Sequence, residues 1–146
     1  MLLSCRVVEF AVLGRNVKYS GHSHLYSDGK EVGPVPKLAV VEPLDGGEPM
    51  LLHCGRDWTV LGIAGFPSVK AAKQRAERTY PGVSNQWTKT RVSKAQANAY
   101  LTKLWKGVKS SFCARRPDQL NSLIGKGSVR ICDICVREFH EDLGGR

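Results

Sequence analysis

The sequence predicts an α+β protein: a small antiparallel β-meander with two amphipathic helices, followed by a small module anchored by cysteines. Three observations lead to this prediction. Short β-prone runs alternate with turn residues between residues 37 and 64. Two later stretches place apolar residues at helical spacing behind N-cap residues. Near the end, Cys113 is followed by a Cys-x-x-Cys pair. We therefore divide the chain into an N-terminal segment (1–36), an α+β domain (37–108) and a cysteine module (109–146).

The N-terminal segment begins with an apolar run and continues into an irregular, turn-rich stretch. The run Val7-Val-Glu-Phe-Ala-Val-Leu13 is either a strand of the first domain or a loosely attached end. Residues 16–36 are rich in Gly, Ser, Tyr, His and Pro. Two histidines, His22 and His24, lie two apart there. Because no third ligand is close in sequence, we expect a hydrated loop at this point and no metal site.

The meander is predicted from three β-prone runs separated by glycine-containing turns. The runs are Leu38–Val41, Met50–Cys54 and Trp58–Ala64. His53 and Cys54 are neighbours on the second run, and neighbouring strand residues point to opposite faces. They therefore cannot form the hydrogen-bonded pair that a nucleophile and its base require. The pattern predicts a core cysteine and a surface histidine.

Two helices are predicted after the meander. Ser68 caps the first, whose apolar face is formed by Val69, Ala72, Ala76 and Tyr80. Residues 83–92, which include Trp87, could add an edge strand. Ser93 and Gln96 form a capping box that opens the second helix. Its broad apolar face requires a covering surface and consists of Ala97, Tyr100, Leu101, Leu104, Trp105 and Val108.

The module near the end contains one complete zinc knuckle and one that lacks a cysteine. Ser110-Ser-Phe-Cys113 is followed, after eighteen residues, by Cys132-Asp-Ile-Cys135. Two thiols three apart can face one cation, and two such knuckles close a tetrahedral zinc site. Ser110 occupies the place of the first thiol. Between the knuckles, residues 115–125 predict a short helix with Leu120, Leu123 and Ile124 on one face. A brief strand (128–133) follows, and then a helix capped by Asp133, with Val136, Phe139 and Leu143 on its apolar face.

These residues resemble a known domain. The runs Ser-Phe-Cys113, Leu-Ile-Gly125 and Ser-Val-Arg-Ile-Cys132-Asp-Ile-Cys135-Val resemble the four-cysteine zinc-binding domain at the amino end of the ClpX unfoldase subunit, over about residues 109–143. The resemblance implies a small treble-clef-like module that binds zinc, dimerises and receives substrate and adaptor proteins. It also implies that Cys113, Cys132 and Cys135 match three zinc ligands and that Ser110 matches the fourth. No family is recognised for residues 1–108.

The serine leaves three outcomes open at the metal site, because a neutral hydroxyl is a poor zinc ligand. The first is zinc with an open or water-filled position, the second is a replacement ligand, and the third is a metal-free core held by apolar packing. His140 is the obvious replacement. It lies about 500° around a helix from Cys135, at 100° per residue, which is a poor direction for closing the site. Disulfide cycling of Cys132 and Cys135 ranks below zinc, since no thioredoxin-like order of strand and helix surrounds them.

Composition and charge narrow the function classes. The apolar fraction of 42% is ordinary for a globular protein, and the five cysteines are an odd number, which favours metal binding over a disulfide framework. No transmembrane span or signal peptide is recognised, so we expect a cytoplasmic protein with reduced thiols. Neither a catalytic constellation nor a phosphate-loop frame is found, so we expect no enzymatic activity and no small-molecule substrate.

Two function hypotheses remain. The first is a non-enzymatic protein-interaction protein, acting as an adaptor or dimeriser through the zinc-binding module. The second is a small basic nucleic-acid-binding protein. The net charge is +9, and residues 70–116 hold twelve Lys or Arg against one acidic residue. The candidate phosphate-contacting residues are Lys70, Lys73, Arg75, Arg78, Lys89, Arg91, Lys103, Lys106 and Lys109.

Overall fold

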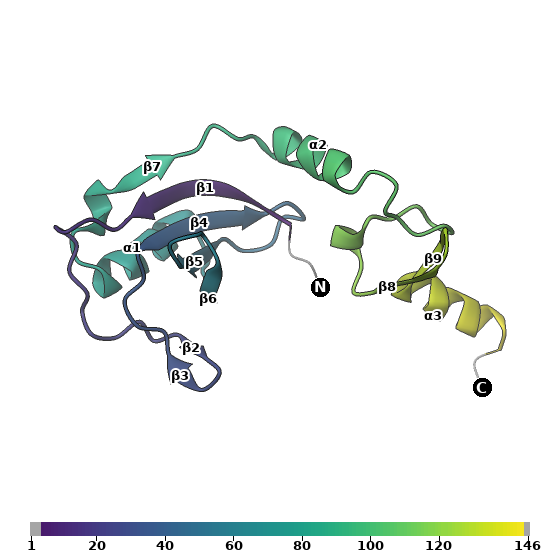
Figure 1. The fold of residues 1–146 in the computed structure, drawn as a ribbon, viewed down its shortest axis with the longest axis horizontal. Helices are drawn as coiled ribbons and strands as arrows, with labels where there is room; N and C mark the ends of the chain where they lie inside the picture. The colour runs from purple at the N-terminus through teal and green to yellow at the C-terminus, as the bar shows by residue number, and fades with distance from the viewer. Residues whose placement is uncertain (1–3, 145–146) are drawn as a thin grey trace. The chain divides into compact units, whose positions relative to one another are not determined.

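The computed structural model describes residues 4–144, in which helices and β-sheets are combined in an α+β fold (Figure 1). The chain divides into two compact units: the first is Cys5–Lys94, and the second contains the residues from Ala95 onward. This division differs from the predicted boundaries at residues 36 and 108. Residues 5–36 belong to the same unit as the meander, and the second predicted helix belongs with the cysteine module.

The first unit is built on a five-stranded antiparallel sheet with the strand order β6-β5-β4-β1-β7. The predicted meander is confirmed, because β4, β5 and β6 pair in succession. The strands are β1 (Cys5–Val12), β4 (Lys37–Pro43), β5 (Met50–Cys54), β6 (Val60–Gly65) and β7 (Trp87–Lys89).

The first apolar run is a strand of this sheet. As β1 it pairs with β4 on one side and with the short edge strand β7 on the other. Between β1 and β4, a small hairpin joins β2 (Tyr26–Ser27) to β3 (Lys30–Glu31). Its two turn residues, Asp28 and Gly29, have φ values of 51° and 76°. Asp and Gly are the residue types that tolerate this left-handed conformation in a two-residue hairpin turn.

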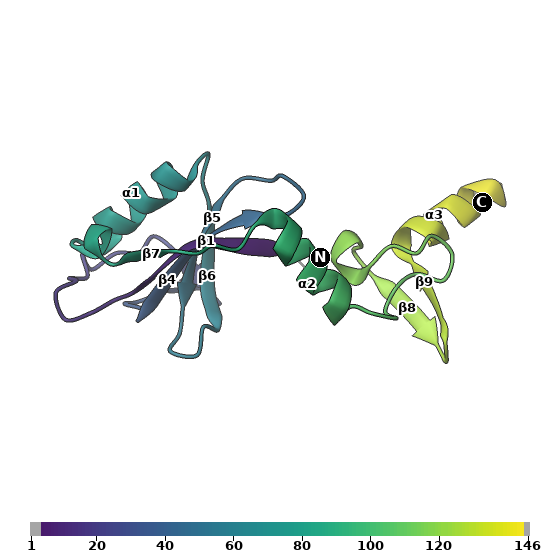
Figure 2. The same ribbon diagram turned by 90° about the horizontal axis from the view of Figure 1, so that it is seen from above.

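The predicted first helix forms as α1 (Val69–Thr79) and lies along one face of the sheet (Figure 2). The Ser68 side chain accepts a hydrogen bond from the Ala71 amide, which confirms the predicted N-cap. Ala72 and Ala76 are fully buried, and the Tyr80 hydroxyl accepts a hydrogen bond from the Val35 amide at 3.2 Å. The core also contains Ala11, Val32, Leu38, Val40, Leu51 and Val83.

One prediction about the side chains of the first unit is wrong. His53 is not a surface residue: it is buried, as is its neighbour Cys54, for which burial was predicted. Both faces of the sheet are covered here, since the adjacent residues Leu38 and Ala39 on β4 are buried too. Lys73, one of the candidate phosphate contacts, is partly buried on α1. Its ammonium forms a 2.6 Å ion pair with the buried carboxylate of Glu9.

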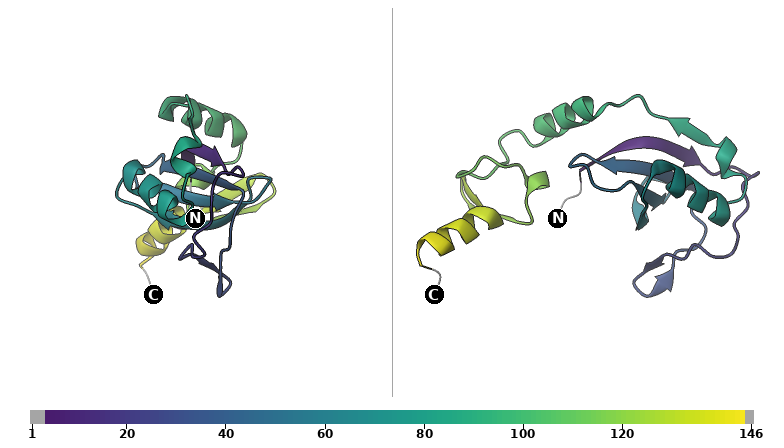
Figure 3. Two further views of the ribbon diagram at one scale, coloured as in Figure 1. Left: turned by 90° about the vertical axis from the view of Figure 1, so that its left-hand side faces the viewer. Right: turned by 180° about the vertical axis from the view of Figure 1, so that it is seen from behind.

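The second unit contains α2 (Lys94–Leu104), a hairpin of β8 (Leu123–Lys126) and β9 (Val129–Cys132), and α3 (Asp133–Asp142) (Figure 3). The predicted strand and final helix are confirmed as β9 and α3. Helix α2 forms where the capping box predicts it, but none of its residues is buried. The described residues therefore cover its apolar face only in part: Leu101 and Trp105 are half-buried, whereas Tyr100 and Leu104 are exposed.

The helix predicted over residues 115–125 does not form. Pro117–Gln119 make a single 3-10 turn, and the chain becomes extended at Leu120, where φ is −133° and ψ is 152°. The Asp133 carboxylate accepts hydrogen bonds from the Asn121 and Ser122 amides, which directs the next residues into β8. Gly125 does not end a helix. A Cβ atom there would lie 2.9 Å from the Val129 carbonyl oxygen, so the hairpin requires glycine at this position.

The N-cap of α3 is Cys132, one residue before the predicted cap. Its sulfur accepts a hydrogen bond from the Cys135 amide at 3.4 Å. Asp133 is the first residue of the helix, where its negative charge also interacts favourably with the positive end of the helix dipole.

None of the helices between residues 4 and 144 combines the length and apolar character needed to cross a lipid bilayer.

Candidate metal centre

The first knuckle is a tight turn between residues 110 and 115. The Ser110 amide donates a hydrogen bond to the Arg115 carbonyl at 2.9 Å, and the Ala114 amide donates to the Ser110 carbonyl at 3.0 Å. Ala114 has a φ of 58°, which turns the chain sharply after Cys113. The Ser111 amide bonds to the Arg130 carbonyl at 2.7 Å, and the Arg130 amide bonds back to the Ser111 hydroxyl. These bonds tie the first knuckle to the strand that enters the second.

Three cysteine sulfurs meet where the two knuckles face each other. The Sγ atoms of Cys113, Cys132 and Cys135 all lie within 4.8 Å of one another, and those of Cys113 and Cys132 are 3.5 Å apart. A tetrahedral zinc ion about 2.3 Å from each sulfur would space the sulfurs about 3.8 Å apart. All five cysteines of the chain are free thiols. The three sequence-predicted ligands are therefore together, at a spacing that could hold a metal ion.

Ser110 lies at the fourth corner of this cluster. Its side chain is 1% exposed, and its Oγ atom is 3.9 Å from the Cys135 sulfur. The Ser110 hydroxyl also accepts a hydrogen bond from the Phe112 amide at 3.4 Å. The Cys132 sulfur accepts one from the Cys135 amide in the same way at the second knuckle. The serine thus keeps the knuckle's contact to the backbone while lacking the negative charge of a thiolate.

The cluster separates the proton affinities of two of its thiols. The hydrogen bond from the Ser110 side chain, followed by a bond from the Arg115 backbone, lowers the pKa of Cys113 to about 6. Burial, followed by the hydrogen bonds of the neighbouring thiols Cys113 and Cys132, raises the pKa of Cys135 to about 11. At neutral pH, Cys113 is therefore a thiolate and Cys135 a thiol. A cation bound between them would displace the remaining proton.

The sulfur cluster also forms most of the interior of this unit. The buried residues in the described range 95–144 are Ser110, Leu120, Cys132 and Cys135. Leu123, Ile131 and Ile134 pack partly against them. Small domains with so little buried apolar surface are usually stabilised by a metal, by disulfides or by oligomerisation. The stability of the second unit is therefore expected to depend on the interactions of these cysteine side chains.

His140 does not replace the missing ligand. In the part of the chain that the structure describes, Cys113, Cys132 and Cys135 are the one group of three or more His, Cys, Asp or Glu side chains close enough to share an ion. His140 lies exposed on α3, outside this group. His22 and His24 stack on each other at 5.9 Å between ring centroids, and His22 faces the Glu31 carboxylate at 3.5 Å.

The nine candidate phosphate-contacting residues are distributed over both units. Six lie between Lys70 and Arg91 in the first, and Lys103, Lys106 and Lys109 lie in the second. All except Lys73 are exposed.

Sequence analysis missed the role of Asp133, whose carboxylate binds the backbone amides just before β8, beside the second knuckle. The sequence signal for this role was an acidic residue inside the Cys-x-x-Cys motif, but the same residue also fitted the N-cap of the predicted final helix.

Comparison of the chain with models of protein families, with curated proteins and with solved structures finds no match. The resemblance to the ClpX-type domain therefore depends on the motif residues themselves.

We expect Cys113 to be the most reactive thiol of the metal-free protein at pH 7. Its lowered pKa makes it mostly thiolate above about pH 6, whereas burial raises the pKa of Cys5 and Cys54. Alkylation by iodoacetamide after chelation, followed across pH 5–9 by peptide mass spectrometry, would measure this. Ser110→Ala should move the midpoint of Cys113 upward, and Ser111→Ala should not. Equal midpoints for Cys113, Cys5 and Cys54 would contradict the prediction.

Proposed function

We propose that this chain is a non-enzymatic protein-interaction protein whose second unit is a zinc-binding, treble-clef-like module. The order of the parts in that unit supports the proposal: a knuckle turn is followed by the β8–β9 hairpin and then by α3, which begins at the second knuckle. Zinc is the metal that structural cysteine sites of this spacing hold most often. In this proposal three thiolates bind the ion, and a water completes the site beside the Ser110 hydroxyl.

The observation that carries the interaction role is the amount of apolar side chain that the second unit leaves exposed. Val136 and Phe139 on α3 and Leu143 at its C-cap follow one another at helical spacing, and all three are exposed, Leu143 by 88%. On the hairpin, Ile124 and Val129 are exposed as well, and both lie on the face opposite to Leu123 and Cys132. Exposed apolar surface gathered in so small a unit marks a protein contact site.

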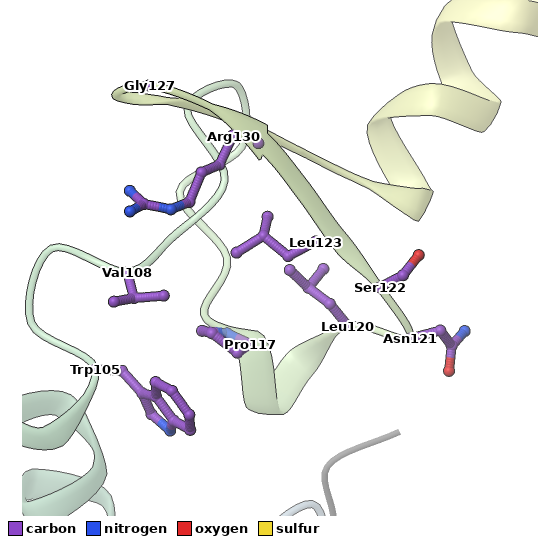
Figure 4. A pocket seen from close by; sticks show the side chains of 10 residues that line it. Trp105, Val108, Pro117, Leu120, Asn121, Ser122, Leu123, Gly127 and Arg130 are labelled. Atoms are coloured by element: carbon purple, nitrogen blue, oxygen red, sulfur yellow. The ribbon is translucent and has the colours of Figure 1, made fainter.

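A groove adds a second feature of the same kind. It has a volume of about 580 Å³ and lies between the end of α2 and the inner face of the hairpin (Figure 4). Trp105, Val108, Leu120 and Leu123 supply apolar walls, and Arg130 supplies a positive charge. The indole nitrogen of Trp105 is buried and has no hydrogen-bond partner among the described residues. A peptide carbonyl in the groove would provide one.

For the stripe on α3, the partner we propose is a second copy of the chain. A stripe along one helix can pair with itself about a two-fold axis, which is the commonest symmetry of soluble oligomers. The dimer would cover Val136 and Leu143 without altering the sulfur cluster. The family resemblance also implies dimerisation.

We expect the purified chain to contain one zinc ion and Ser110→Cys to bind it more tightly. The fourth thiolate should raise zinc affinity at least about 10-fold, which is the size of effect that second-shell changes already produce. Elemental analysis, competition with a chelator and thermal melting would measure this. Ser111→Cys is the matched control, because that residue faces the Arg130 amide and adds a thiol away from the cluster. Equal zinc affinity and equal melting of Ser110→Cys and the native chain would show that residue 110 is not at a ligand position.

We expect the zinc-loaded chain to dimerise and the double variant Val136→Glu, Leu143→Glu to remain a monomer, because two carboxylates would then have to be buried in the interface. Sedimentation velocity over a range of protein concentrations measures the association. The control is Glu138→Lys, on another face of α3, which changes charge but should leave the dimer intact. Zinc content should be equal in all three proteins. A native chain that stays monomeric at every concentration would contradict self-association.

Nucleic-acid binding is the second candidate, favoured by one specific observation. Eight of the nine candidate cations are exposed, and Tyr100 on α2 is 65% exposed and therefore available to stack on a base. We expect any binding to weaken with salt, with a slope of about −0.9 per phosphate contacted in duplex DNA.

Fluorescence anisotropy with an arbitrary duplex and an arbitrary single strand, between about 50 and 200 mM salt, would measure this slope. The double variant Lys70→Gln, Arg78→Gln should reduce it by about two, since two phosphate contacts would be lost. Lys30→Gln, outside the basic block, should leave it unchanged. Absence of binding at the lowest salt concentration would exclude this second candidate.

A further inference from the structure

The first unit contains a small cavity that the proposed function does not use. Its volume is about 170 Å³, and it lies among β5, the end of β6, α1 and the segment before β2. Leu25, Leu51 and Phe66 line its apolar side. The polar residues that line it include His53, His24 and Arg75. These residues are far apart in sequence, so only the fold brings them together.

His53 is the unusual member of this lining. Its side chain is 2% exposed, and neither of its ring nitrogens has a hydrogen-bond partner among the described residues. Its ring lies 6.0 Å from the Tyr80 ring. Burial lowers the pKa of His53 to about 4, so the ring is neutral at pH 7 and offers one donor and one acceptor. Buried polar groups are almost always hydrogen-bonded in native proteins, so both atoms call for a partner.

The remaining polar lining favours an anion. Arg75 is exposed on α1, where it reaches the cavity, and the lining contains no carboxylate. The nearby Glu31 carboxylate is occupied, because it accepts hydrogen bonds from the Ser23 and His24 amides at 2.8 and 3.2 Å. These bonds hold His24 at a φ of 58°, an uncommon conformation for a residue other than glycine.

We propose that this cavity binds a small organic oxyanion whose charged group pairs with Arg75, whose polar body bonds to His53, and whose apolar edge contacts Leu25 and Phe66. The volume sets the size of the ligand. It equals the share of liquid volume of about five or six water molecules, and it lies below the range of about 300–1,000 Å³ of pockets for drug-sized ligands. The ligand therefore has roughly ten or fewer non-hydrogen atoms. A carboxylate and a phosphate ester supply the same charge chemistry here.

The test titrates the 146-residue chain with inorganic phosphate, with butanoate and with the uncharged analogue butanamide, at constant ionic strength. Nitrogen-detected NMR of the histidine rings reports directly on His53. We expect saturable shifts of its ring nitrogens with at least one of the two anions and weaker binding of the amide. Saturation by butanoate alone identifies a carboxylate site, and saturation by phosphate alone identifies a phosphate site.

Two variants of α1 complete the experiment. Arg75→Gln removes the proposed cation and should weaken anion binding about 10-fold or more, while Arg78→Gln, exposed on the same helix but outside the lining, should not. Both side chains are exposed, so both variants should fold. The proposal is overturned if neither anion produces saturable shifts at His53, if butanamide binds as well as butanoate, or if the two variants weaken binding equally. None of these results depends on zinc or on dimerisation.

Discussion

The second unit depends on the meeting of three cysteine sulfurs at one point. Leu120 is the one large aliphatic residue buried in its described part, and the rest of the interior is Cys132, Cys135 and the Ser110 hydroxyl. An interior of this size stabilises a fold only weakly, and small domains of this kind are usually stabilised by a metal, by disulfides or by oligomerisation. Hydrogen bonds between Ser111 and Arg130 tie the knuckle turn to the hairpin, and the Cys135 amide donates to the Cys132 sulfur at the start of α3. The interior of the second unit therefore consists mainly of cysteine side chains and contains few apolar side chains.

This construction explains why large apolar side chains face outward. In the first unit, α1 covers the sheet and buries alanines and Tyr80 in a continuous core. The second unit has no equivalent layer in its described residues, where the buried cluster consists of Leu120, Cys132 and Cys135. Phe112 and Phe139 stack edge to face at 5.4 Å and remain partly exposed. The small interior of the second unit thus leaves these apolar side chains exposed to solvent.

Ser110 separates two roles that a knuckle cysteine usually combines. One role is to accept a backbone amide hydrogen bond that closes the turn, and the Ser110 hydroxyl performs it toward Phe112. The other is to give a thiolate to the metal, which a hydroxyl at neutral pH does poorly. The hydroxyl has instead become a hydrogen-bond partner of its neighbours and lowers the pKa of Cys113. The turn at residue 110 therefore closes without a thiol at this position.

Local patterns in the sequence determined the meander, the capped helix α1, the positions of the knuckles and the start of α3 near Cys132. These features depend on periodicity, caps and short spacings, which act within a few residues. The tertiary structure alone decided that β1 lies between β4 and β7, that residues 123–126 form a strand, and that His53 is buried beside a cavity. The hairpin formed because Asp133 holds the chain before it and Leu123 pairs with Cys132. His53 was buried because both faces of its strand are covered. Such pairings between distant segments override local propensity, since they decide where each backbone group finds its hydrogen bond.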